Sequence, residues 1–197
     1  MLLAFSERLD GLISTYGFTI GYNVCRLWRL KTKSNFITFD NQTHKNTMPQ
    51  SLYKMLAHIV YSTKNRVDLI APGIEDGLFG YMHGIAENNG AKLILANGTA
   101  NHVHLLVSLP KKIDIPELIG DMKRDSSSWI KKQDSIFSNF YWQKGYGAFS
   151  IGQSQVETVS GYIKRQKEHH KKQDFKDEYR ALLNKYEVDF DEKYVWD

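Results

Sequence analysis

The chain has 197 residues, of which 42% are hydrophobic and 13% aromatic, a composition that excludes disordered and fibrous proteins and fits one domain of ordinary size. Its single cysteine, Cys25, excludes an internal disulfide framework and a cysteine-based zinc site. No apolar run approaches the roughly 18–20 residues that cross a membrane, so we expect a soluble protein without a membrane partner.

The formal net charge of +4 is distributed unevenly along the chain. Residues 48–172 contain sixteen basic and eleven acidic residues, whereas residues 173–197 contain four basic and eight acidic ones. The basic middle part indicates a polyanionic partner. We expect the acidic tail to pack on the body of the protein or on a partner subunit rather than on a nucleic acid.

Residues 1–47 differ from the rest because their apolar periodicity is weak and residues 31–46 are mostly polar. A second start-like point follows at Met48. We therefore predict a poorly ordered N-terminal extension over residues 1–47, which a mis-assigned start codon would explain, and a functional domain over residues 48–197. The alternative is an amphipathic arm built on Leu9, Ile13, Tyr16 and Phe18.

The first half of this domain predicts a strand, a helix and a hairpin. β-Forming residues predict a strand over 53–62, and apolar spacing predicts a helix that stops at residues 88–90. Strands over 92–96 and His102–Leu109 follow, joined by an Asn-Gly turn at residues 97–98. The apolar residues at helical spacing are Ile74, Leu78, Tyr81, Met82 and Ile85.

The second half predicts a helix, a strand and two further helices. A capping box that begins at Asp114 opens the first helix. A strand is predicted over 146–151, and a second capping box, beginning at Ser154, opens the next helix. A shorter helix is predicted over 175–183. The apolar residues of the first two helices are Leu118, Ile119, Met122, Trp129, Ile130, Val156, Val159 and Ile163.

This order of elements predicts an α+β fold of the ferredoxin-like, or split βαβ, kind. Its antiparallel sheet has helices on one face, and a C-terminal helix is added. The fold alone determines no function, because it is shared by nucleic-acid binders, metal chaperones and enzymes.

His102 and His104 lie two residues apart on a predicted strand, so their side chains project from the same face of the sheet while Val103 projects from the other. Two imidazoles so placed can share a divalent metal. The alternative is a pair of partly exposed histidines without a ligand.

Tyr162 and Gln166 are four residues apart on a predicted helix and therefore share a face. A tyrosine beside basic residues can attack a phosphate, although its ordinary pKa of about 10 requires a metal, a base or positive charge to favour the phenolate. The alternative is a packed aromatic side chain and a solvated amide.

Together these residues resemble a known family. The sequence His-Val-His at residues 102–104 resembles the His-hydrophobic-His motif of HUH single-strand endonucleases, and Tyr162 with Gln166 resembles the motif of their single-tyrosine branch. Residues 48–197 as a whole are similar to small bacterial transposases of the insertion-sequence two-hundred type and their REP-associated relatives. Further similar stretches are residues 48–52, 62–66, 126–130, 142–149, 169–170 and 194–197.

The resemblance implies a mechanism. His102, His104 and Gln166 would hold one Mg²⁺ or Mn²⁺, and Tyr162 would attack a phosphodiester of hairpin-bearing single-stranded DNA. The product would be a 5′-phosphotyrosine and a free 3′-hydroxyl, which can later rejoin the strand. The resemblance also implies a homodimer in the bacterial cytoplasm, with the tyrosine serving either its own histidines or those of the partner.

Several basic residues are candidates for contacts with DNA phosphates. Four of them, Lys123, Arg124, Lys131 and Lys132, are predicted to form one basic stripe on the helix that begins near Asp114, and the alternative is an ordinary solvated face. Trp142, Tyr146 and Phe149 can stack on bases or pack in the core. We expect His58 to pack within the sheet and residues 169–170 to face solvent or the DNA backbone. The basic candidates are Lys64, Arg66, Lys123, Arg124, Lys131, Lys132, Lys164 and Arg165.

Two other functions remain open. One is a domesticated enzyme of the same chemistry, a REP-associated tyrosine transposase that acts on dispersed palindromes. The other is a non-catalytic module that binds nucleic acid on the sheet, which the presence of His102, His104, Tyr162 and Gln166 disfavours.

Overall fold

The computed structural model describes residues 51–112, 114–171 and 173–196. Within them lies one four-stranded antiparallel sheet with the strand order β2-β3-β1-β4. Because β3 lies between β1 and β2, this is the split βαβ arrangement, and the predicted fold class is confirmed. The strands are β1 (Met55–Ser62), β2 (Lys92–Gly98), β3 (His102–Leu109) and β4 (Gly147–Ile151).

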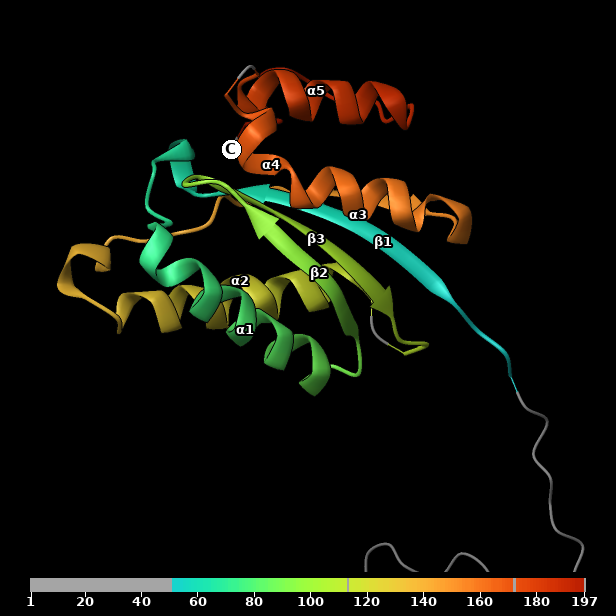
Figure 1. The fold of residues 1–197 in the computed structure, drawn as a ribbon, viewed down its shortest axis with the longest axis horizontal. Coiled ribbons are helices and arrows are strands. Elements are labelled where there is room, and N and C mark those ends of the chain that lie inside the picture. The colour runs from blue at the N-terminus through green and yellow to red at the C-terminus, as the bar shows by residue number, and fades with distance from the viewer. Residues whose placement is uncertain (1–50, 113, 172, 197) are drawn as a thin grey trace, which may run out of the picture. The chain divides into compact units, whose positions relative to one another are not determined.

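Helices cover both faces of the sheet, so the prediction that they lie on one face is corrected (Figure 1). On one face lie α1 (Pro72–Asn88) and α2 (Ile115–Lys131), and on the other lie α3 (Val156–Lys164), α4 (Gln166–His169) and α5 (Phe175–Lys185). None of the helices within the described ranges has the length and apolarity that crossing a membrane requires. Short 3₁₀ turns are η2 (Lys64–Arg66), η3 (Ser135–Phe137) and η4 (Gln153–Gln155).

The alternation of side chains along β1 and β3 divides the core in two. Ile59 and Val103 are fully buried in the cluster beneath α1 and α2. Val60 is fully buried in a cluster with α5, and Leu106 in one with α3. The strands are apolar on both faces because each face is covered. The histidines of β3 therefore lie in an interior layer and not on an open sheet.

One predicted turn and one predicted helix cap are wrong. The predicted turn at residues 97–98 lies within β2, and the hairpin loop follows at residues 99–101. A Cβ atom on Gly98 would lie 2.2 Å from the carbonyl oxygen of His102, so this glycine permits close approach of two strands. The predicted cap at Ser154 is replaced by the side chain of Gln155, whose Oε1 accepts the N–H of Gly152 at 2.9 Å.

The prediction for residues 1–47 concerns a part of the chain outside the described residues.

Buried polar contacts hold the segment between α2 and β4 against α2. Trp142 Nε1 donates to Ser126 Oγ at 2.9 Å. Lys123 Nζ donates to the carbonyls of Gln143, Lys144 and Gly145 at 3.0, 3.1 and 2.7 Å. Burial lowers the pKa of Lys123 to about 8. Lys123 is thus an internal donor, and its assignment to a phosphate-binding stripe is corrected. Trp142 and Phe149 are likewise core residues.

We predict that Ser126→Ala lowers the free energy of unfolding by about 1–3 kcal/mol, because it leaves the buried indole N–H of Trp142 without an acceptor. Ser128→Ala is the matched control, since Ser128 is exposed on the same helix and its hydroxyl, like that of Ser126, donates to the carbonyl four residues earlier. Urea denaturation of both variants measures the difference. Equal decreases in the free energy of unfolding for the two variants would show that the bond to Trp142 contributes nothing to stability.

Candidate active site

The two histidines of β3 lie on the sheet face covered by α3, α4 and α5. Both are buried, at 0% exposure, and Val103 between them points into the opposite core. His102 is paired with Ser62, and His104 with Val60, across to β1. The expectation that His102 and His104 share a face is confirmed, but they are not exposed.

A carboxylate from α5 reaches both histidines. Glu178 Oε2 lies 3.3 Å from His104 Nε2, 3.6 Å from His102 Nε2 and 2.8 Å from His170 Nε2. Glu178 is only 2% exposed, because it lies on the buried face of α5 with Phe175 and Leu182. An acidic side chain thus forms the centre of the cluster.

Tyr162 and Gln166 contact the other oxygen of the same carboxylate. The Tyr162 hydroxyl donates to Glu178 Oε1, and Gln166 Nε2 donates to it at 2.8 Å. The predicted continuous helix is wrong, since α3 ends at Lys164 and Arg165 leaves helical geometry before α4 begins. Both side chains nevertheless meet at Glu178, so the structure brings together all four residues on which the resemblance rests.

Hydrogen bonds on the far side of each imidazole orient the ring. His102 Nδ1 lies 2.7 Å from Asn101 Oδ1, and His104 Nδ1 lies 3.0 Å from His58 Nε2. Asn101 Oδ1 can only accept, so His102 carries its hydrogen on Nδ1 and turns the Nε2 lone pair toward Glu178. This is the tautomer in which a histidine binds metal through Nε2.

Burial and charge determine the protonation states. Burial, with a contribution from His104, lowers the pKa of both His58 and His102 to about 3, so both are neutral. Burial alone would raise the pKa of Glu178, but His104 and His170 outweigh it and hold this pKa well below its usual value. Burial and the negative charge of Glu178 raise the pKa of Tyr162 well above 10, so its hydroxyl keeps its proton.

The donor set fits a divalent cation. Ligand atoms of His102, His104, His170 and Glu178 all lie within 4.8 Å of one another. Three buried atoms in or beside this group have no hydrogen-bond partner among the described residues, namely His102 Nε2, His104 Nε2 and Gln166 Oε1. Unpaired buried polar atoms are costly, and a cation would satisfy all three. Imidazole nitrogen with carboxylate and amide oxygen is a set that Mn²⁺ and Mg²⁺ accept.

Glu178 was not predicted as a site residue from the sequence, and His170 is more buried than predicted. We expected residues 169–170 to face solvent or DNA, whereas the His170 side chain is 12% exposed and bound to Glu178. The sequence did contain a signal for Glu178, because this carboxylate lies within the apolar stripe of Phe175, Tyr179 and Leu182. Acidic residues in such a stripe are rare unless they are paired. His58 packs within the sheet as expected, at 2% exposure.

The other basic candidates are scattered. Arg124 is paired with Asp121 and Asp125, so with the burial of Lys123 the predicted stripe on α2 is interrupted. Lys64 and Lys131 lie over the ring of Tyr141, at 5.9 and 3.5 Å from its centroid. Arg66 contacts Trp196, and Lys132, Lys164 and Arg165 are exposed.

We predict that the metal-free protein loses stability on acidification. The unfolded chain protonates His58 and His102 near pH 6.5 and the folded chain only near pH 3, so the free energy of unfolding falls as pH decreases between these values, by about 1.4 kcal/mol per pH unit for each histidine. Urea denaturation in EDTA measures this slope, and His58→Gln should reduce it. A flat profile from pH 7 to pH 4 would contradict the assignment of neutral, buried histidines.

The chain matches a known protein family and individual members of that kind. The family model described as transposase, IS200-like, matches residues 51–166. The ISDra2 transposase TnpA of Deinococcus radiodurans is 22% identical over 120 residues, which is 58% of this chain and 86% of that protein. The transposase for insertion sequence element IS200 of Salmonella typhimurium is 25% identical over 119 residues, which is 58% and 78%.

Two solved structures are also similar. A putative transposase from Deinococcus radiodurans has a TM-score of 0.48 and 22% identity, and the match covers 59% of this chain and 93% of that chain. A REP-associated tyrosine transposase bound to a REP hairpin has a TM-score of 0.48 and 13% identity, with 61% and 73% coverage. The family match ends at residue 166, so His170 and Glu178 lie beyond it.

Proposed function

The chain belongs to the IS200-like transposase family, and we propose that it cleaves and rejoins hairpin-bearing single-stranded DNA through Tyr162, with a divalent cation held by His102 and His104. The observation that carries this proposal is the convergence of a tyrosine hydroxyl, two metal-competent imidazoles and an amide on one buried carboxylate. A DNA-binding module without catalysis has no need of such a set.

We include Glu178 and Gln166 in the cation site. Glu178 Oε2 lies nearest to the two Nε2 atoms, and Gln166 Oε1 is the third unpaired atom of the cluster. Bound there, Mg²⁺ or Mn²⁺ would polarise the scissile phosphate and offset the negative charge of Glu178 that now raises the pKa of Tyr162. His170, hydrogen-bonded to Glu178 Oε2, helps to orient the carboxylate.

Tyr162 has its own access to substrate. Together with His58, His169 and Glu178 it lines a pocket of about 270 Å³ between α3 and α5, through which a phosphate can reach the phenol. The phenol oxygen attacks phosphorus as its proton leaves, and the bond from phosphorus to the 3′-oxygen breaks with protonation of that oxygen. The products are a 5′-phosphotyrosine and a 3′-hydroxyl, and the reverse attack rejoins DNA without ATP.

The protein acts as a homodimer in this proposal, as the family resemblance implies. Each protomer holds a complete site, because the Tyr162 ring lies 5.8 Å from the ring of His104 in the same chain. The tyrosine can therefore serve the histidines of its own protomer.

We predict that incubation with Mn²⁺ and hairpin-bearing DNA from the flanks of the gene yields a covalent protein–DNA adduct on denaturing gels. Tyr162→Phe should abolish the adduct, because it removes the attacking oxygen. Tyr186→Phe is the matched control, since Tyr186 lines the same pocket, and it should retain the adduct. An adduct with Tyr162→Phe would show that the nucleophile is another residue.

We also predict that Glu178→Gln weakens Mn²⁺ binding by about tenfold to a hundredfold, since it replaces a charged oxygen ligand with a neutral one. His102→Ala should weaken it at least as much, and hairpin binding should persist in both variants. Titration of free Mn²⁺ by electron paramagnetic resonance measures the affinity. Glu168→Gln, an exposed acid on α4, is the control. Unchanged Mn²⁺ affinity in Glu178→Gln would remove Glu178 from the site.

A further inference from the structure

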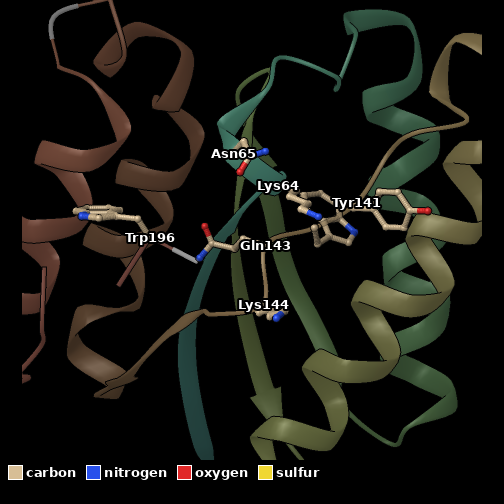
Figure 2. Close-up of a pocket in the computed structure, with 7 residues that line it drawn as sticks. Lys64, Asn65, Tyr141, Gln143, Lys144 and Trp196 are labelled. Carbon is tan, nitrogen blue, oxygen red and sulfur yellow. The ribbon is translucent and has the colours of Figure 1, made fainter. Parts of the chain in front are cut away.

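Three stretches of the sequence that the tyrosine chemistry does not use meet at one pocket of about 500 Å³. They are the turn η2 with Lys64 and Asn65, the segment 141–144, and Trp196 near the C-terminal end. Figure 2 shows Trp196 on one side, Lys64 and Tyr141 on the other, and Gln143 between them. These stretches lie far apart in the sequence, so only the tertiary structure forms the pocket.

Two of its walls continue the β-sheet beyond β1. Thr63 forms an isolated antiparallel bridge with Trp142, and the N–H of Lys64 donates to the carbonyl of Tyr141 at 2.7 Å. The N–H of Gln143 donates to the carbonyl of Ser62 at 2.9 Å. Backbone pairing therefore holds these walls in a defined position.

Trp196 forms the third wall, and contacts with Arg66 and Glu192 hold it in place. Its carbonyl accepts from Arg66 Nη1 at 3.3 Å, and the Arg66 guanidinium lies 5.8 Å from the centre of the indole. Trp196 Nε1 donates to Glu192 Oε2 at 2.9 Å. The indole thus has a fixed orientation at the rim of the pocket.

The pocket is connected to the sheet face that carries the candidate active site. Ser62, whose Oγ donates to the side chain of Gln143, is paired with His102 in the sheet. Directly paired residues of an antiparallel sheet project to the same face. The side chain of Gln143 is therefore joined to the sheet on the face that carries His102 and His104.

The lining of the pocket suits an aromatic anion. Its seven lining residues include three aromatic side chains, two lysines and no acidic residue. Tyr141 is 51% exposed, and Lys64 and Lys144 are exposed. The volume falls in the range of roughly 300–1,000 Å³ that is usual for small-molecule sites. Flat aromatic faces bind bases, and lysines bind phosphates.

We propose that this pocket binds one unpaired nucleotide of the DNA strand, adjacent to the phosphate that Tyr162 attacks. The base stacks on Trp196, and Lys64 and Lys144 contact its phosphates. This inference rests on the proposed function, because it places the substrate of the same site. It gives the C-terminal end of the chain a role in holding the strand.

The test measures binding without cleavage, in EDTA and in the Tyr162→Phe background. A short single-stranded oligonucleotide carries the fluorescent base 2-aminopurine, and a blunt duplex of the same sequence is compared. Trp196→Ala should weaken binding of the single strand by about tenfold and relieve the quenching of 2-aminopurine at one position, while duplex binding is unchanged. Tyr194→Ala, an exposed aromatic residue of the same tail outside the pocket, should bind like the parent.

A second variant separates a loss of DNA binding from a folding defect. Lys144→Ala removes an exposed side chain. It should weaken single-strand binding severalfold and reduce the salt dependence of the binding constant by the amount expected for about one phosphate contact. The inference is overturned if Trp196→Ala and Lys144→Ala both bind the single strand like the parent, if both weaken the duplex equally, or if free deoxynucleoside monophosphate binds as tightly as the strand. Failure of the adduct assay alone would overturn the chemistry and leave the pocket intact.

Discussion

The candidate active site depends on one buried carboxylate. Glu178 is 2% exposed, yet it is charged, because imidazoles, a phenol and an amide surround both of its oxygens. Burying an unpaired carboxylate is expensive, so the same contacts that keep Glu178 charged also hold α5 on the sheet. Three buried polar atoms around it have no hydrogen-bond partner among the described residues, and a divalent cation is the ligand that would satisfy them. In the proposed function, stability and metal chemistry are therefore coupled in this cluster.

The two faces of the sheet differ, because one forms an apolar core and the other carries the polar cluster. The face beneath α1 and α2 is packed with apolar side chains and carries Val103 and Leu105 of β3. The opposite face carries His102 and His104 of the same strand, and it is covered by helices that supply Tyr162 and Glu178. Alternation along one strand thus joins a core to a reactive cluster. The rigid core gives the two imidazoles a fixed spacing, which a metal site requires.

The C-terminal part of the chain contributes both to the pocket lined by Trp196 and to the cluster around Glu178. Trp196 packs with Tyr179 in the apolar cluster of α5, the helix that also carries Glu178. The family match ends at residue 166, so these contributions lie outside the matched part of the chain. In the proposed reaction, the same segment completes the metal site and holds the strand, which links substrate position to the chemistry.

The sequence alone determined the local features of the fold. Period-two alternation in β3 placed His102 and His104 on one face, and the Asp114 cap marked the start of α2, where its side chain accepts the N–H of Glu117 at 2.8 Å. Such features depend on neighbours within a few residues. Only the tertiary structure decided that the histidines are buried, that Lys123 donates to backbone carbonyls, and that Glu178 lies between the histidines. Contacts between distant segments decide these matters, because burial and hydrogen-bond partners depend on how helices pack against the sheet.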